Sequence, residues 1–257
     1  MPESTLSVSR QDILRLIGQY LGWNQSYALW SAGQMQRAED IVASGLRQFY
    51  TPPILPGERT IHKWSFLSPW ATLGLQADKG DYDLPDDFGG LDDELTFISD
   101  TVGSCPIQLV SEAEIRRRRQ VEGNDVTGYP TMACIVPVAS DGDDPQRWMI
   151  SFRPIPGGDY ELQFRYRSNP FQLSPSKPYP LGGQPHAETL ISSCLAAAEL
   201  KMNDEQGPYY ADFVEKLRSS VALDRSINLQ TLGYNGDGPT ISEYERGTTV
   251  LFNGVIV

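Results

Sequence analysis

The stretch SAGQMQRAEDIVASGLRQFY, residues 31–50, is followed by Thr51 and then by Pro52 and Pro53. Its apolar residues recur every three or four positions, which places them along one face of an α-helix. This stripe consists of Ala38, Ile41, Val42, Gly45, Leu46 and Phe49. Because proline lacks an amide hydrogen and fits poorly inside a helix, we predict a helix over residues 31–50 that ends before the two prolines and buries its stripe.

Partners for this stripe are predicted at both ends of the chain. Residues 9–22 have helical spacing, with Ser9 as a suitable N-cap. The helical period returns over residues 185–205, where Pro185 suits the first turn, and a further helix follows at 209–223. Because these helices flank a middle of different character, we expect them to pack together into one bundle.

The middle of the chain has an extended period. From about residue 60, apolar and polar residues alternate in short runs that are separated by Gly, Pro and Asp. The runs are TIHKWSFL, LTFIS, IQLV, TMACIVPVA, RWMISFRPI and DYELQFRYR. They predict an antiparallel β domain, interrupted by one helix at 111–123 for which Ser111 and Glu114 form a capping box.

The predicted fold is therefore α+β. A helical bundle is formed by N- and C-terminal helices, an antiparallel β domain is inserted between them, and an extended C-terminal arm follows. We expect four parts: 1–58 for the N-terminal helices, 59–182 for the inserted β domain, 183–225 for the C-terminal helices and 226–257 for the arm.

The composition argues against several functional classes. The chain has 257 residues, with 21 Lys and Arg against 33 Asp and Glu, which gives a net charge of −12. General basic contacts to nucleic acid are not expected from this balance, since that affinity comes from cations that displace phosphate counterions. The sequence lacks GxSxG, P-loop, HExxH and GxGxxG motifs, and its three cysteines include no CxxC pair. We therefore predict no enzyme, no catalytic residue, no cofactor and no metal.

No targeting or membrane segment is evident in the sequence. The opening MPESTLSVSRQDIL has no basic stretch followed by an apolar core. No apolar run reaches the roughly 18 residues that a membrane span needs. We therefore expect a soluble, cytoplasmic protein that makes no contact with a membrane.

Two charged runs are candidates for pairing. Seven carboxylates lie within residues 81–94, among them the adjacent Asp86 and Asp87. A solvated turn is the favoured interpretation, and a Ca²⁺-binding loop is the alternative, although the third ligand and the glycine of an EF-hand are missing. The basic run consists of Arg116, Arg117, Arg118 and Arg119. We expect these arginines to pair with acidic residues such as Asp86 and Asp87, in this chain or in an adjacent copy, and contact with nucleic acid is the alternative.

Eight aromatic residues lie in or near the strand-like runs. They are Trp64, Phe66, Trp70, Trp148, Phe152, Tyr160, Phe164 and Tyr166. Core filling is the favoured interpretation, and a platform for stacking sugar rings is the alternative. His62 and His186 stand alone in the sequence, and we expect each to be a surface or capping residue rather than a ligand.

Two motifs resemble a known protein family. WSFLSPW at residues 64–70 and YDLPDDFGGL at residues 82–91 resemble the head-tail connector (adaptor) proteins of tailed bacteriophages, including longer forms akin to tail tubular protein A. The helical stripe that ends in FYTPP at residues 49–53 fits the same order. These motifs are structural rather than catalytic, and the specific part of the resemblance covers residues 9–95.

The resemblance implies a structural virion protein at the head-tail interface, made in the host cytoplasm. Identical subunits, usually twelve, form a closed ring beneath the portal protein, contact tail proteins and let DNA pass without specific binding. A net charge of −12 fits such a ring, because an acidic channel repels DNA. The alternative function is a carbohydrate-binding or hydrolytic phage tail protein, in which aromatic and acidic residues of the β domain act on a host glycan.

The C-terminal segment TTVLFNGVIV, residues 248–257, is the predicted partner-binding segment. Its apolar residues are Val250, Leu251, Phe252, Val255, Ile256 and Val257. The resemblance implies that such an arm reaches the portal or a neighbouring subunit, where it adds to an exposed sheet edge. The alternative is a hairpin around Asn253 and Gly254 within the chain's own β domain.

Overall fold

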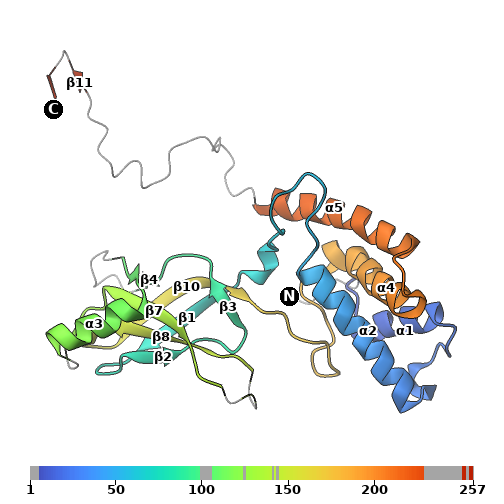
Figure 1. The fold of residues 1–257 in the computed structure, drawn as a ribbon, viewed down its shortest axis with the longest axis horizontal. Coiled ribbons are helices and arrows are strands. Elements are labelled where there is room, and N and C mark those ends of the chain that lie inside the picture. The colour runs from blue at the N-terminus through green and yellow to red at the C-terminus, as the bar shows by residue number, and fades with distance from the viewer. Residues whose placement is uncertain are drawn as a thin grey trace.

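Helices from both ends of the chain lie together, and the strands from the middle lie beside them (Figure 1). The computed structural model describes residues 6–98, 106–123, 126–140, 142, 145–228, 251–252 and 255–256. The α+β fold predicted from the sequence is confirmed, with helices at both ends and a strand-rich middle.

The described helices and strands have the following bounds. The helices are α1 (Arg10–Tyr20), α2 (Ala32–Tyr50), α3 (Glu112–Glu122), α4 (Ala187–Asn203) and α5 (Pro208–Asn228), with the 3₁₀ turns η1 (Tyr27–Leu29), η2 (Ser65–Leu67) and η3 (Gln184–His186). The strands are β1 (Trp70–Leu75), β2 (Asp81–Asp83), β3 (Phe88–Leu91), β4 (Thr96–Phe97), β5 (Gln108–Leu109), β6 (Thr127–Gly128), β7 (Met132–Pro137), β8 (Trp148–Arg153), β9 (Ile155–Pro156), β10 (Tyr160–Ser168), β11 (Leu251–Phe252) and β12 (Val255–Ile256).

Local side-chain chemistry begins the first three helices. Ser9 caps α1 and Ser31 caps α2, each through a complete capping box. Only half of the capping box predicted for α3 is present, because the Ser111 side chain accepts a hydrogen bond from the Glu114 amide while the Glu114 carboxylate pairs with Arg117 and Arg118. These bonds satisfy amide groups that a helix leaves without a partner in its first turn.

Glu199, on α4, caps the start of α5. Its carboxylate accepts backbone hydrogen bonds from Gly207 and Tyr209 at 3.1 Å and from Tyr210 at 3.3 Å. A negative charge at this place also complements the positive end of the α5 dipole. The turn between α4 and α5 is therefore held by a buried acid rather than by its own sequence.

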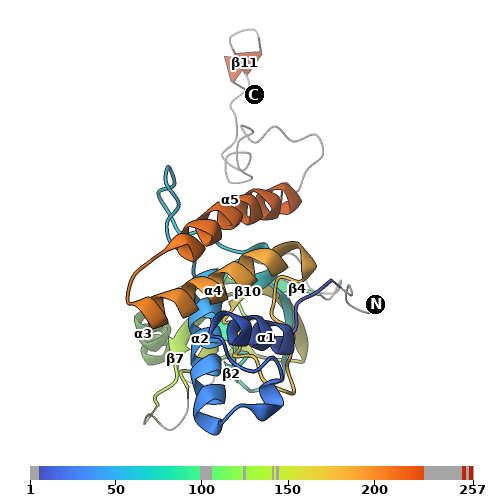
Figure 2. The same ribbon diagram turned by 90° about the vertical axis from the view of Figure 1, so that its right-hand side faces the viewer.

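Helix α4 is the centre of the helical region. It contacts α1, α2 and α5, and it lies between α5 and the other two helices in the turned view (Figure 2). Its side chains are buried on most sides, which explains why they are small and apolar, as in the run from Ala196 to Ala198. The stripe predicted for α2 is buried here, with Ile41 and Phe49 fully enclosed.

The strand-rich region has its own hydrophobic core. Strand β10 pairs antiparallel with β1, β3 and β4, and a second sheet has the order β2-β8-β7-β5. Side chains from both sheets fill the core between them, including Ile150, Phe152, Leu162 and Phe164. Most pairings are antiparallel as predicted, but β5 with β7 and β6 with β9 are short parallel pairings.

The end of the chain forms one small sheet in the described residues. Strand β11 pairs antiparallel with β12, so that Leu251 faces Ile256 and Phe252 faces Val255. The two strands pair with each other and with no other described strand. Val250 and Val257, which belong to the same predicted binding segment, lie outside the described residues.

Candidate functional site

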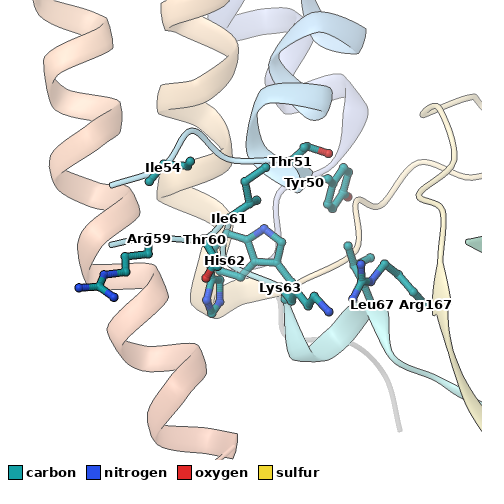
Figure 3. A pocket seen from close by; sticks show the side chains of 11 residues that line it. Tyr50, Thr51, Ile54, Arg59, Thr60, Ile61, His62, Lys63, Leu67 and Arg167 are labelled. Atoms are coloured by element: carbon teal, nitrogen blue, oxygen red, sulfur yellow. The ribbon is translucent and has the colours of Figure 1, made fainter. Parts of the chain in front are cut away.

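A hollow of about 510 Å³ opens where the helical region meets the strand-rich region (Figure 3). We call it the junction groove. It is lined by Tyr50, Thr51, Ile54, Arg59, Thr60, Ile61, His62, Lys63, Trp64, Leu67 and Arg167. Most of these residues belong to the segment that leaves α2 and leads to β1, so the groove follows the first connection between the two regions.

Trp64 fastens this connection to the helices. Its ring nitrogen donates a hydrogen bond of 2.9 Å to the Phe49 carbonyl, and only 2% of the residue is exposed. The ring packs against Phe49, Phe66 and His186 at centroid distances of 4.9, 5.3 and 5.1 Å. An indole ring can be buried in this core because its single polar group, the ring N–H, has a hydrogen-bond acceptor near the end of α2.

Asp224 fastens the same connection to α5. The carboxylate is buried, with 1% of the residue exposed. It contacts His62 Nε2 at 2.8 Å and accepts hydrogen bonds from the amide and the hydroxyl of Ser65. Next to it, Arg225 forms an ion pair of 2.8 Å with Glu58, which also belongs to this segment. A buried carboxylate is stable only when it has such donors. Because these donors come from His62 and Ser65, the site joins the start of the strand-rich region to the last turns of α5.

The same three side chains do not form a hydrolytic triad. In such a triad, histidine lies between the acid and the serine, so that it can remove the proton of the serine hydroxyl. Here the acid lies between the other two, because both His62 and Ser65 contact Asp224. The arrangement orients the backbone rather than activating a nucleophile.

His186 is buried beside this cluster, and the surface position predicted for it is wrong. The residue occupies the N-cap position of α4, but its side chain makes no capping bond and only 4% of the residue is exposed. Its Nδ1 lies 3.2 Å from the Ser220 hydroxyl. Burial lowers the pKa of His186 below its ordinary value, while Asp224 opposes this shift and His62 adds to it. His62 is also mostly enclosed, so both histidines help join distant parts of the chain.

Cations line the outer side of the groove. Arg59 and Arg167 lie at opposite sides of it, with Lys63 between them (Figure 3). A smaller hollow of about 220 Å³ shares Lys63 and Arg167 and adds Arg165 and the acidic Asp92 and Asp93. Since Arg167 pairs with Asp92 at 3.3 Å, the positive charge of the groove comes mainly from Arg59 and Lys63.

The acidic run is only partly solvated. Asp87 accepts hydrogen bonds from the Tyr166 hydroxyl at 2.9 Å and from the Ser168 hydroxyl at 2.6 Å, so it holds β10. Burial, and to a smaller extent the Asp87 carboxylate, raises the pKa of Tyr166 to about 12. Asp86 is exposed beside it. Of the two predicted pairing acids, one already serves the chain's own fold.

All four arginines of the basic run have partners in the chain. Arg116 pairs with Glu112, Arg117 and Arg118 pair with Glu114, and Arg118 also reaches Glu122. Arg119 contacts Asp81 of β2 at 3.4 Å. Their side chains stay substantially exposed, so each of these pairs contributes little to stability.

The structure places most of the predicted aromatic residues in the two cores. Trp64 lies in the helical core, with Phe66 packed against it, and Phe152, Phe164 and Tyr166 lie in the strand-rich core. Trp148 and Tyr160 are packed against the latter core. Trp70 is the exception, because 60% of it is exposed and Arg165 lies 5.5 Å from its ring centroid. Core filling explains this set better than a sugar platform does.

The described residues contain neither a cluster of metal ligands nor a helix that could span a membrane. In the ranges that the structure describes, no three His, Cys, Asp or Glu side chains gather as metal ligands would. No helix within those ranges has both the length and the apolar composition for crossing a membrane.

Known proteins place this architecture in a family. The chain matches the family described as SU10 adaptor protein over residues 11–233, a span that includes both cores and the junction groove. No curated protein matches it. The match confirms the resemblance to phage adaptors that WSFLSPW and YDLPDDFGGL indicated. Adaptors of this family are structural proteins that associate with portal and tail proteins. The chain therefore belongs to the SU10 adaptor protein family and is a structural component of a bacteriophage virion.

Proposed function

We propose that copies of this adaptor form a closed ring beneath the portal protein and join the capsid to the tail, with DNA passing through the opening without specific binding. The observation that carries the proposal is the family match over residues 11–233, which covers the whole folded unit rather than one region of it. Cyclic closure suits such a joint, because every subunit then has both of its interfaces satisfied.

The charge of the chain supports DNA passage. With a net charge of −12, a ring of these subunits repels a polyanion on average. Repulsion keeps DNA from adhering to the channel wall, while specific contacts would slow its release. The portal and the tail are then the partners that the ring binds, and the adaptor reaches the virion after its synthesis in the host cytoplasm.

We assign different tasks to the four proposed parts of the chain. The helices of 1–58 and 183–225 form the ring wall, and the β domain of 59–182 is attached to that wall through the segment that Trp64 and Ser65 hold. The arm of 226–257 docks on the portal or on a neighbouring copy through its apolar end. The antiparallel pairing of Leu251 with Ile256 supports this assignment, because strands that are already paired lose less entropy on binding than unpaired ones.

We further propose that the charged runs contribute contacts between copies. Arg116 and Arg117 keep most of their side chains exposed, and Arg118 and Arg119 lie on the same helix. Asp86 is the acid best placed to meet them from an adjacent copy, because it is exposed and forms no ion pair with another described residue. Asp87 can take part only through its backbone or a lone pair that Tyr166 and Ser168 leave free.

The experiment combines the full chain with its portal protein. Mass photometry and electron cryomicroscopy are expected to show a closed ring that follows the symmetry of the portal. A chain that stays monomeric and ignores the portal at micromolar concentration contradicts the proposal. Titration of the chain with glycans provides the comparison with the alternative function, since sugar-dependent quenching of tryptophan fluorescence is expected only for a carbohydrate-binding tail protein.

A further inference from the structure

We propose that the junction groove of one copy receives the turn between α4 and α5 of a neighbouring copy. The inference rests on the proposed ring and names the two surfaces that meet in it. The groove offers exposed apolar side chains beside cations, and the turn offers exposed apolar side chains beside carboxylates. The two surfaces therefore complement each other in two ways: both expose apolar side chains, and their charges are opposite.

The groove has apolar surface that its own chain leaves uncovered. Ile54 is 55% exposed and Ile61 is 47% exposed, although both line the hollow of about 510 Å³. Arg59 and Lys63 are exposed beside them, and neither forms an ion pair with another described residue. Apolar side chains flanked by unpaired cations fit a partner segment with apolar and acidic side chains.

The turn between α4 and α5 has the matching composition. Leu200 is 45% exposed, Met202 is 50% exposed and Tyr209 is 36% exposed. Asp204 and Glu205 are exposed between them, and neither pairs with a cation in the described part of the chain. Lys201 adds one positive charge, so the turn, defined as residues 200–209, still has one excess negative charge.

The turn is held in shape before any partner binds. Glu199 accepts backbone hydrogen bonds from Gly207, Tyr209 and Tyr210, which fixes the end of the turn against α4. The Tyr209 ring also packs edge-on against Tyr20 at a centroid distance of 5.2 Å. A preformed surface loses little conformational entropy on docking, so modest contacts suffice for binding.

One chain cannot bring its own turn into its own groove. The groove lies beside the last turns of α5, where Asp224 and Arg225 contact its segment, whereas Tyr209 stands at the first turn of α5. The intervening helix is rigid and rises about 24 Å at 1.5 Å per residue. Figure 1 shows the turn and the segment before η2 near opposite ends of α5. Contact between these surfaces must therefore join two copies, and a head-to-tail contact of this kind generates a ring when its rotation closes.

Charge reversal on the full chain tests the proposal. The variant Arg59→Glu/Lys63→Glu changes the groove, and Asp204→Lys/Glu205→Lys changes the turn. Each alone is expected to raise the concentration for half-maximal ring formation at least about tenfold, because like charges then face each other. Combining all four substitutions is expected to restore assembly, since the pairs are exchanged. The readout is mass photometry over a concentration series, alone and with the portal protein.

The matched control is Lys79→Glu/Lys177→Glu. It makes the same charge change at two exposed lysines that lie outside both the junction groove and the turn and form no ion pair with another described residue, and assembly is expected to stay as in the unmodified chain. Circular dichroism on every variant establishes that the fold is kept. The inference is overturned if the groove variant still assembles normally, if the fourfold variant fails to recover, or if the control is equally impaired.

The two proposals fail in distinguishable ways. If the unmodified chain forms no ring even with the portal, the proposed function itself is contradicted, and the docking of the turn with it. If the unmodified chain forms rings and the reversals have no effect, only the docking is contradicted, because the ring then uses other surfaces.

Discussion

At the scale of single residues, the family motif WSFLSPW works as a fastening rather than as a recognition sequence. Trp64 anchors the connection to α2, Ser65 anchors it to α5, and Leu67 enters the helical core. The Ser68 carbonyl then accepts hydrogen bonds from Arg165 of β10. One short segment thus holds two helices and one strand, so that the strand-rich region has a defined start on the helices.

Asp224→Ala is expected to weaken this fastening strongly. The substitution removes the acceptor of Ser65 and the partner of His62, which leaves buried donors unsatisfied. We expect a loss of about 3 kcal/mol in the free energy of unfolding, as for other broken buried pairs. Urea unfolding measures it. The control Glu215→Ala changes an exposed carboxylate on the same helix and is expected to shift the free energy by less than about 0.5 kcal/mol; an equal loss in both variants rules out the role given to Asp224.

The stability of the chain is expected to fall in mild acid, in part through His186. Burial lowers the pKa of this residue in the fold, whereas in the unfolded chain it has its ordinary value near 6.5. Below that value the unfolded state therefore binds more protons than the folded state, and stability decreases as the pH falls. We expect His186→Gln to show a shallower decrease between about pH 7.5 and pH 5.5 in urea unfolding at each pH. If the pH dependence of the free energy of unfolding is the same in His186→Gln as in the unmodified chain, other titrating groups account for all of it, which would falsify the assignment to His186.

The sequence could indicate only part of this site. Trp64 and Phe66 were predicted to fill a core because aromatic residues in alternating runs usually do, and the structure confirms it. The pairing of Asp224 with His62 and Ser65 spans 162 and 159 residues. Local periodicity carries no information about contacts at that separation. The sequence therefore could not show that Asp224 and His62 lie together.

At the scale of the elements, the close approach of α2 and α4 shapes the helical core. Gly45 of α2 lies against the backbone of Cys194, and its carbonyl accepts a 2.7 Å hydrogen bond from the Ser193 hydroxyl. A side chain at this position has no space, because its Cβ would lie 2.6 Å from the Cα of Cys194. Small residues on both helices thus set their separation, and α2 buries its stripe to full depth.

Gly45→Ala and Gly33→Ala are expected to act in opposite directions. Both residues lie in α2, but a Cβ at Gly33 meets nothing within 4 Å. Gly45→Ala forces the two helices apart and is expected to cost about 1–3 kcal/mol. Gly33→Ala removes backbone freedom from the unfolded chain and is expected to stabilise by about 0.5–1 kcal/mol. Thermal and urea unfolding of both variants decide the matter, and a stabilising Gly45→Ala contradicts the packing described here.

Helices were easier to predict than strand pairing, for a physical reason. The apolar stripes of α1, α2 and α4 repeat over several turns, so periodicity located them, and α1 and α2 also begin at local side-chain caps. Helix α5 continues to Asn228, past the predicted end at 223, because the polar residues there include no helix-breaking proline or glycine. Strands β6 and β9 contain two residues each, too few to show a period of two, so their parallel pairing left no sequence signal.

At the scale of the whole molecule, two hydrophobic cores share one chain. The helical core takes residues mainly from both ends of the sequence, with Trp64, Leu67 and Leu173 added from the connections, and the strand-rich core takes residues from the middle. The second connection returns to the helices where the Leu181 amide donates to the Tyr50 hydroxyl at 2.8 Å, close to where the first one departs. Both crossings are thus fixed at the end of α2. This arrangement supports the proposed division into an inserted domain and a bundle, because the buried side chains form two separate clusters.

A single cavity in one core is therefore expected to loosen that core alone. Phe164→Ala in β10 and Phe213→Ala in α5 each remove a ring that is at most 1% exposed, at a cost of about 3–5 kcal/mol. Hydrogen exchange followed by mass spectrometry reads the result for each segment of the full chain. For Phe164→Ala we expect faster exchange in β1, β8 and β10 with protection kept in α2 and α4, and for Phe213→Ala the reverse. If both variants accelerate exchange everywhere to the same extent, the cores unfold as one unit and the division into an inserted domain and a bundle is wrong. Segments near Trp64 and Asp224 are expected to respond to both variants, because they belong to the connection that joins the two cores.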